Sequence, residues 1–300
     1  MKDRILIFGA TGYLGSRLVA ALKSDGYIVT CIGKNENNDI IVDLSDFELV
    51  ANIKLKYKYK AIFHLAAINE TLIQSNIKMA YDVNVVATRA IVELAKRNGI
   101  KYISYCSTFH VIGQTTGQIV PHVLLKPKND YGLTHLLSEQ ILESLCPNEG
   151  IQVNIVRPTN IYGVPLSIKS FDRWSLIPFS FVRQAVTKGK ILLKTNGNQQ
   201  RNFVDINNVI ASLMFFGSRK VNVIGYNTLS IRDFALLVSK RLSSKYGEVE
   251  VILPEPEAEE KIIFEPKLEF LGDNNILENS PDNLNLYIDE FAFKIEGYNE

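Results

Sequence analysis

The sequence predicts an α/β fold: a Rossmann-type, doubly wound parallel sheet with a smaller C-terminal α/β domain. Short apolar runs alternate with helical periodicity through the first half of the chain, as in parallel strands joined by helices. Three glycines separate the first apolar run from the first helical segment, as in a dinucleotide-binding turn. The chain has 300 residues, of which 46% are hydrophobic and 22% charged, enough for a substantial core.

The predicted strands are mostly apolar, which indicates burial on both faces of the sheet. They cover residues 4–8, 27–32, 61–67, 102–107 and 153–157. The helices between them carry apolar residues at three- and four-residue spacing. They cover residues 15–23, 46 to about 55 with Ser45 as the cap, 80–97 and 131–145.

Regularity fades after Pro158. Residues 164–199 hold one helical stretch near 179–187, residues 201–217 predict a strand and a helix, and the acidic residues 255–260 predict a solvated loop or linker. We therefore expect two domains. A dinucleotide-binding domain covers residues 1–163 plus about 200–218, and a substrate-binding domain covers 164–199 plus about 219–300.

Composition excludes several classes of protein. The net charge of +1 gives no global attraction to nucleic acid or anionic membranes, and the basic run 53–60 is interpreted as a solvated helix end and loop. Three cysteines match neither a metal site nor a disulfide framework, which indicates a reducing compartment. Membrane-spanning and signal segments are not recognised. We expect a cytoplasmic protein without metal, nucleic-acid or membrane partners.

The glycine turn follows the first predicted strand. The first glycine allows a tight turn, the second lets the backbone approach a pyrophosphate, and the third lets the helix pack on the strand. The N-terminus of that helix offers N–H groups and partial positive charge to phosphates. The turn predicts nicotinamide dinucleotide binding by Gly9, Thr11, Gly12, Tyr13, Leu14 and Gly15.

The cofactor's adenosine end is predicted after the second strand. That strand ends at Gly33 and Lys34, without the acid that usually binds the ribose hydroxyls of NAD. Lys34 can instead meet a 2′-phosphate, which favours NADP over NAD; a lysine in a polar loop is the alternative interpretation. Asp43 and Leu44 follow the next short strand, where an adenine-contacting pair would lie.

Tyr131 begins a predicted helix, and Thr108 follows the strand 102–107. A tyrosine and a hydroxyl that converge on a nicotinamide can perform acid–base chemistry at a carbinol or carbonyl carbon. The tyrosine moves the proton, and the hydroxyl holds the substrate oxygen. The alternatives are a half-buried aromatic at a helix start and an ordinary strand-end hydroxyl.

With these motifs the chain resembles the extended short-chain dehydrogenases/reductases of the NAD-dependent epimerase/dehydratase family. The resemblance implies an enzyme that binds a nucleotide-activated sugar and forms a homodimer through helices 80–97 and 131–145. The matching pieces run in family order over roughly residues 3–230. They are the glycine turn, Asp43-Leu44, Phe63 to Ala67, Asn84 to Thr88, Tyr102 to Thr108 with Gly113, Tyr131-Gly132, Arg157 to Gly163 and Arg201 to Val204.

The resemblance also implies roles for individual residues. Thr108 and Tyr131 match catalytic positions, Asn84 should support the backbone at a strand end, and Arg201 matches an arginine that meets nucleotide phosphates. The implied cofactor contacts add Leu65, Ala66, Ala67, Asn84, Tyr131, His135, Pro158 and Ile161. The implied substrate contacts are Thr108, Phe109, Asn160 and Arg201.

His135 departs from the family pattern Tyr-x-x-x-Lys, although it shares a helix face with Tyr131. The family lysine bonds the nicotinamide ribose, and its charge favours tyrosinate. A neutral imidazole can bond a ribose hydroxyl but gives little charge. Three alternatives follow. In the first, His135 replaces the lysine as the third catalytic residue. In the second, the site is weakened, or a neighbour such as Lys126 or Lys128 supplies the charge. In the third, catalysis is lost and a binding protein remains.

The other histidines carry weaker expectations. His64 lies inside an apolar strand and is interpreted as a satisfied core histidine. His110 and His122 lie between Thr108 and Tyr131, where we expect surface positions, although either can reach substrate.

The leading functional hypothesis is an NAD(P)-dependent oxidoreductase acting at C4 of a nucleotide-activated sugar, namely a 4-keto-6-deoxy sugar nucleotide reductase of deoxysugar biosynthesis. Phe109 and His110 follow Thr108 where family dehydratases carry an Asp-Glu pair, which disfavours dehydration. The alternative enzyme is a nucleotide-sugar 4-epimerase with tightly bound NAD. The alternative of another class is an NAD(P)-binding sensor or scaffold.

Overall fold

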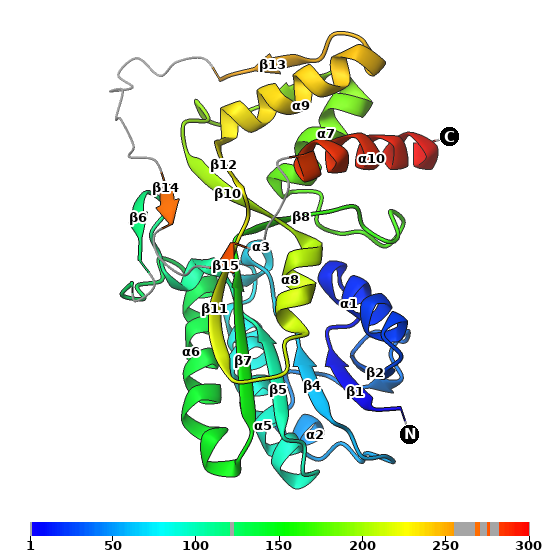
Figure 1. Ribbon diagram of the computed structural model, residues 1–300, viewed down its shortest axis with the longest axis vertical. Coiled ribbons are helices and arrows are strands. Elements are labelled where there is room, and N and C mark those ends of the chain that lie inside the picture. The colour runs from blue at the N-terminus through cyan, green and yellow to red at the C-terminus, as the bar shows by residue number, and fades with distance from the viewer. Residues whose placement is uncertain (1, 121–122, 255–267, 271–274, 277–281, 300) are drawn as a thin grey trace. The chain divides into compact units, whose positions relative to one another are not determined.

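The structure, a computed structural model, describes residues 2–120, 123–254, 268–270, 275–276 and 282–299 (Figure 1). It contains two compact units. The first comprises Met1–Gln114, Val123–Pro158 and Val209–Asn222, and the second comprises Thr115–His122, Thr159–Asn208 and Val223–Glu300. The large parallel sheet and its helices confirm the predicted α/β fold class. The assignment of cofactor and substrate to separate domains stays a prediction.

The sheet of the first unit has the strand order β11-β7-β5-β4-β1-β2-β3. From β3 to β7 the neighbouring strands pair in parallel, with Phe8 opposite both Ile32 and His64. The order reverses at β1, where doubly wound sheets bind ligands. The bounds are β1 (Arg4–Phe8), β2 (Ile28–Gly33), β3 (Ile40–Ile41), β4 (Ala61–His64), β5 (Tyr102–Cys106), β7 (Gln152–Pro158) and β11 (Arg219–Ile224).

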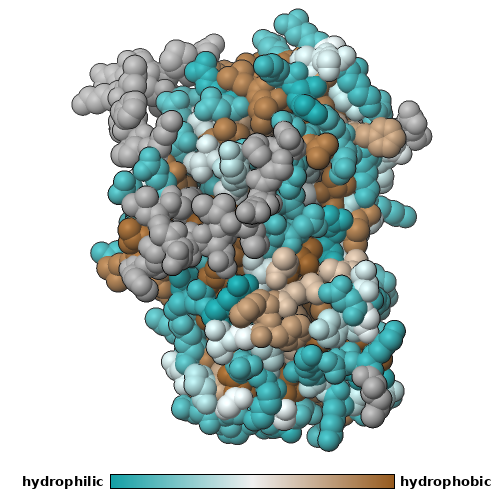
Figure 2. All heavy atoms as spheres, viewed as in Figure 1, coloured by the Kyte–Doolittle hydropathy of each residue, from teal (hydrophilic) through white to brown (hydrophobic). Residues whose placement is uncertain are grey.

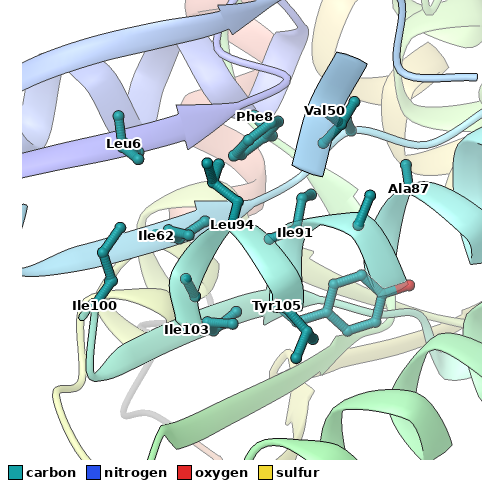
Figure 3. Close-up of a cluster of buried hydrophobic side chains, with 14 of the residues drawn as sticks. Leu6, Phe8, Val50, Ile62, Ala87, Ile91, Leu94, Ile100, Ile103 and Tyr105 are labelled. Atoms are coloured by element: carbon teal, nitrogen blue, oxygen red, sulfur yellow. The ribbon is translucent and has the colours of Figure 1, made fainter. Parts of the chain in front are cut away.

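Both faces of the strand β1 are buried. Leu6 and Phe8 share a cluster with Leu94 of α5 (Figure 3), while Ile5 and Ile7, which point to the other face, are also fully buried. This explains why Ile5 to Phe8 are all apolar. The helical elements are α1 (Tyr13–Ser24), α2 (Phe47–Ala51), α3 (Glu70–Ile73), α4 (Ile77–Tyr81), the π-helical turn η1 (Asp82–Val86), α5 (Ala87–Arg97), the 3₁₀ turns η2 (Phe109–Val111) and η3 (Pro147–Glu149), α6 (Asp130–Leu145) and α8 (Ile206–Leu213).

Two helix predictions need correction. The cap of α2 is Asp46, whose Oδ1 accepts from Leu49 N at 3.0 Å, so the prediction of Ser45 as the cap is wrong. Ser45 instead donates its hydroxyl to Asp43 at 2.8 Å. The helix α2 starts one residue later than predicted, at Phe47, and ends earlier, at Ala51. The helix predicted over 80–97 begins at Ile77 and contains the π-helical turn.

Smaller sheets and the helices α7, α9 and α10 lie among the described residues of the second unit. The sheets are the three-stranded β12-β10-β8 and the strand pairs β13-β9 and β14-β6. The helix α7 packs on α9 and α10. The helix predicted near 179–187 and the strand predicted after residue 201 are present. The bounds are β6 (Gly117–Ile119), β8 (Asn160–Tyr162), α7 (Ile177–Lys188), β9 (Lys190–Leu192), β10 (Gln200–Asp205), β12 (Asn227–Ser230), α9 (Ile231–Tyr246), β13 (Glu250–Ile252), β14 (Leu268–Phe270), β15 (Asn275–Ile276) and α10 (Asp282–Asn299).

On the face shown in Figure 2, hydrophobic residues form small areas between hydrophilic ones. Within the described ranges, no helix has the length and apolar character needed to cross a membrane. The acidic segment 255–260 lies outside the described residues.

Candidate active site

The glycine turn packs against the ends of two neighbouring strands. Gly9 has φ +84°, and a Cβ there would lie 2.7 Å from the Ala66 nitrogen. A Cβ on Gly15 would lie 2.9 Å from Ala10 Cα, so α1 can start this close to β1 only with glycine at that position. Gly12 is the N-cap of α1, and no side chain caps the helix. This cradle fits a pyrophosphate, because uncapped first-turn N–H groups receive anions.

Asn84 holds the backbone that follows β4. It lies in the π-helical turn η1, a type of insertion that is frequent at functional sites. Its Oδ1 accepts from Ile68 N at 2.6 Å, and its Nδ2 donates to Ile68 O at 3.3 Å and to Thr134 Oγ1 at 3.0 Å. Asn84 thereby connects the segment after Leu65, Ala66 and Ala67 to the helix of Tyr131.

The predicted adenosine residues lie at the ends of β2 and β3. Val42 N donates to Gly33 O at 3.0 Å, and Lys34 is exposed. Hydrogen bonds from Ser45 lower the pKa of Asp43, and the charge of Lys34 adds to this effect. Leu44 is buried. The structure therefore places Gly33, Lys34, Asp43 and Leu44 close together.

Sequence reasoning overlooked a carboxylate near this edge. Asp39 accepts from Cys31 N at 2.7 Å, and burial, followed by the charge of Asp39, raises the pKa of the Cys31 thiol. The side chain of Asp39 is therefore bonded to the middle of β2 rather than to the residue after its end.

Thr108 lies two residues after the end of β5 and is 6% exposed. Its Oγ1 accepts from His110 N at 3.2 Å, which caps the short turn η2. The hydroxyl proton of Thr108 is not used in that contact and can be donated to another oxygen. Phe109 is half-buried and His110 is exposed, as expected for His110; His122 lies outside the described residues.

Tyr131 lies in the first turn of α6, where Asn129 Oδ1 accepts from Gly132 N at 2.9 Å. Its half-buried ring is flanked by two imidazoles in edge-to-face arrangements. The ring centroid of His135 lies 4.7 Å away and that of His110 lies 5.5 Å away. The structure thus brings His110 and His135 to the same tyrosine, and the backbone N–H of His110 is bonded to Thr108 Oγ1.

His135 is turned into the core of the first unit. It is 2% exposed, and Nδ1 lies 2.7 Å from the hydroxyl of Tyr105 on β5. Burial lowers the pKa of His135 to about 3, with smaller contributions from His64 and His110. The imidazole is therefore neutral at physiological pH and adds no positive charge beside Tyr131.

His64 is a core histidine, as predicted, but only one of its nitrogens is paired among the described residues. Nε2 lies 2.9 Å from Thr88 Oγ1, while Nδ1 has no hydrogen-bond partner there. Burial lowers the pKa of His64 to about 3.

A buried ion pair joins three elements of the site and was not predicted. Arg157 Nε donates to Glu139 Oε1 at 2.8 Å, and a second guanidinium nitrogen meets the other carboxylate oxygen. Ser107 also donates its hydroxyl to Glu139. Glu139 lies two turns after Tyr131 on α6, Ser107 precedes Thr108, and Arg157 precedes the buried Pro158. An acid four residues after His135 was the available sequence signal.

The remaining predicted residues lie elsewhere. Lys126 and Lys128 are exposed in the segment before α6. Asn160 and Ile161 lie on β8 and Arg201 on β10, all in the second unit, where these strands pair in parallel. Asn160 Nδ2 donates to Asn202 O at 2.9 Å. The cofactor and substrate roles of these residues stay predictions.

Comparison with known families identifies the chain. The family model described as "NAD dependent epimerase/dehydratase family" matches residues 5–228. The chain belongs to this family. It is therefore an enzyme of the short-chain dehydrogenase/reductase type, as its glycine turn and the Thr108–Tyr131 region led us to expect.

Curated relatives in this epimerase/dehydratase family act on nucleotide sugars. The UDP-N-acetyl-α-D-glucosaminuronate decarboxylase of Bacillus cytotoxicus is 29% identical over 74% of this chain and 73% of that protein. The UDP-glucose 4-epimerase of Mycoplasma genitalium is 28% identical over 57% of this chain and 56% of that protein.

Solved structures confirm the Rossmann-type fold. The structure of RMD from Pseudomonas aeruginosa complexed with NADPH has a TM-score of 0.79 at 17% identity, covering 99% of this chain and 100% of that chain. MoeE5 in complex with UDP-glucose and NAD has a TM-score of 0.75 at 19% identity, covering 97% and 99%.

The resemblance to this family led us to expect a lysine at position 135, where the chain has the buried imidazole of His135. A lysine at position 135 would place a charge beside Tyr131, whereas His135 is neutral and bonded to Tyr105.

Proposed function

We propose that this chain reduces the C4 carbonyl of a nucleotide-activated sugar, with a 4-keto-6-deoxy sugar nucleotide as substrate and NADPH or NADH as hydride donor. When bound, the dihydronicotinamide supplies the hydride. Tyr131 donates its phenolic proton to the carbonyl oxygen, and Thr108 hydrogen-bonds the same oxygen. The product is the C4 alcohol, and the tyrosinate regains its proton from water.

The observation that carries this proposal is the neutral, buried imidazole beside Tyr131. An uncharged imidazole does not stabilise tyrosinate, and an ordinary phenol keeps its proton at neutral pH. A protonated tyrosine is the acid that carbonyl reduction needs. Epimerisation through a 4-keto intermediate instead begins with alcohol oxidation, for which a tyrosinate base is needed. The site is therefore better prepared for reduction than for oxidation.

The residues of the first unit fit a nicotinamide dinucleotide. The uncapped start of α1 would hold the pyrophosphate through Gly12 to Leu14, and the backbone of Ala66 beside Gly9 would line the groove. Lys34 is exposed after a strand that lacks a terminal acid, which supports NADP. Binding of NADPH and NADH to the wild type and to Lys34→Glu tests this: we expect Lys34→Glu to weaken NADPH binding alone.

The sugar-nucleotide substrate is supported by the curated relatives, one of which is a UDP-sugar decarboxylase and another a UDP-glucose epimerase. In the proposal Arg201 meets the nucleotide phosphates, while Phe109 and Asn160 contact the sugar. The test is incubation of purified protein with NADPH and a 4-keto-6-deoxy sugar nucleotide. We expect oxidation of NADPH and formation of the C4 alcohol in equal amounts.

A 4-epimerase is the second candidate, because a curated relative carries that activity. Inversion of a 4-hydroxy sugar nucleotide without added cofactor, together with no consumption of NADPH on the 4-keto sugar, would replace the reductase by the epimerase. A sensor or scaffold is tested by Tyr131→Phe. No turnover by either protein with undiminished cofactor binding would support it, whereas full retention of turnover in Tyr131→Phe would show that Tyr131 is not the proton donor.

Homodimerisation is also proposed. Apolar side chains that are 36–53% exposed lie on neighbouring helical elements of the first unit. They are Leu72, Ile77, Val86 and Leu133. Light scattering on the wild type and on Ile77→Glu with Leu133→Glu tests this surface: we expect a dimer that the double substitution dissociates.

A further inference from the structure

One nitrogen of His135 is unpaired in the interior of the first unit. Nδ1 lies 2.7 Å from the Tyr105 hydroxyl, whereas Nε2 has no hydrogen-bond partner among the residues that the structure describes. The side chains of both residues are buried, at 2% and 1% exposure. Unpaired buried polar atoms are rare in native proteins, so this one requires an explanation.

The number of protons on the pair is fixed by burial. Removal from water raises the pKa of Tyr105 well above its ordinary value, so its hydroxyl stays protonated. The same effect lowers the pKa of His135, so its imidazole carries a single proton. The direction of the Tyr105–His135 hydrogen bond therefore decides which ring nitrogen carries the imidazole proton. If Tyr105 donates, Nδ1 accepts and the imidazole proton lies on Nε2; if Nδ1 donates, the imidazole proton lies on Nδ1.

The neighbours of Tyr105 favour one direction. The Ser138 hydroxyl also lies within hydrogen-bonding reach of the Tyr105 hydroxyl, and its own proton is directed to the backbone carbonyls of Asn84 at 2.6 Å and Thr134 at 2.9 Å. An imidazole nitrogen is a stronger base than an alcohol oxygen, so the phenol proton is better placed on Nδ1 than on Ser138. Figure 3 shows the Tyr105 hydroxyl pointing away from the apolar residues Ile100 and Ile103.

We propose that Tyr105 is a positioning residue that donates to Nδ1 and holds His135 as the tautomer with its proton on Nε2. Position 135 then presents an uncharged N–H donor beside the Tyr131 ring, 4.7 Å between ring centroids. This N–H keeps the hydrogen-bonding capacity of a lysine without its charge. The inference rests on the proposed function in one respect, namely that binding of the nicotinamide cofactor uncovers Nε2, which is buried in this structure, so that a ribose hydroxyl accepts its proton.

The tautomer is measured directly by ¹⁵N NMR of the full chain with labelled histidines. The two-bond couplings of the ring protons distinguish a protonated from an unprotonated ring nitrogen, and the His135 signals are those missing from His135→Gln. We expect Nε2–H in the wild type and loss of this single tautomer in Tyr105→Phe. A wild-type signal with the proton on Nδ1 would overturn the proposal, and this result needs no soluble variant of Tyr105.

Cofactor binding provides the second readout. We expect Tyr105→Phe to weaken NADPH or NADH binding by about tenfold, the effect of losing one hydrogen bond between His135 Nε2 and the cofactor. Tyr102→Phe is the matched control, because it removes a buried hydroxyl from the same strand, where Tyr102 donates to Phe215 O. Equal binding by the two variants would contradict the proposal. Both measurements are made without a sugar, so a wrong substrate class leaves their outcome unchanged.

Discussion

Arg157 and Glu139 form an ion pair almost completely removed from water. Arg157 Nε donates to Glu139 Oε1 at 2.8 Å, and the two side chains are 6% and 0% exposed. The pair connects β7 to α6, and Ser107 adds the end of β5. One carboxylate thus joins the elements that carry Thr108, Tyr131 and Pro158.

Removal of either charge should destabilise the fold strongly. Glu139→Ala leaves the Arg157 guanidinium buried and unpaired, so we expect the free energy of unfolding to fall by about 3–5 kcal/mol. Urea denaturation measures it. Lys60→Ala is the control, because Lys60 pairs with Asp3 at the surface and its loss should cost at most about 1 kcal/mol. Similar losses of unfolding free energy in the two variants would show that the buried pair stabilises the fold no more than the surface pair does.

The start of α1 should tolerate no side chain at position 15. In Gly15→Ala the added Cβ would meet the backbone of Ala10 and Gly9, so α1 must move away from β1. We expect loss of stability by about 2 kcal/mol or more and loss of dinucleotide binding, measured by denaturation and by NADH fluorescence. Gly297→Ala is the control: no atom lies near its Cβ, and alanine should stabilise α10 by about 0.5–1 kcal/mol.

The fold and the phosphate turn could be predicted because their signals are local. An apolar run, three glycines and a helical period are adjacent in sequence, and they predicted β1, the turn and α1. Helix ends were less predictable, since Ser45 and Asp46 are both suitable caps and only hydrogen-bond geometry shows that Asp46 binds Leu49 N.

The character of His135 could not be predicted, because its partner is 30 residues away. The sequence places His135 on the face of Tyr131, but Tyr105 appears in it only as one apolar-strand residue among five. The same holds for Glu139, whose partners come from the ends of two other strands. Long-range polar contacts of this kind depend on strand order, which periodicity does not give.

The two buried histidines should make stability depend on pH. Burial lowers the pKa of His64 and of His135 to about 3 from 6.5, so the unfolded chain binds protons that the folded chain does not. The stabilisation that the two neutral histidines give is complete above about pH 6.5 and is lost as the pH falls towards 3. At pH 5 the free energy of unfolding is lower by about 2 kcal/mol for each histidine.

Urea denaturation at pH 8 and pH 5 measures this dependence. His64→Gln and His135→Gln should each reduce the difference between the two pH values. The exposed His110 supplies the control, because His110→Gln should leave the difference unchanged. A wild-type stability that is equal at both pH values would contradict the neutral, buried state of these imidazoles.

A lysine at position 135 should restore the charge that the neutral imidazole lacks. In His135→Lys an ammonium beside Tyr131 stabilises tyrosinate, which is the base required to oxidise the C4 alcohol. We expect the rise of the oxidation rate with pH to move to lower pH by about 1–3 units.

His135→Gln is the neutral control and should keep the wild-type pH profile. The measurement is kcat/KM for oxidation of the C4 alcohol between pH 6 and pH 10, with melting temperatures to verify folding, since position 135 is 2% exposed. Identical profiles for the lysine and glutamine variants would mean that another cation, such as Lys126 or Lys128, already acts on Tyr131.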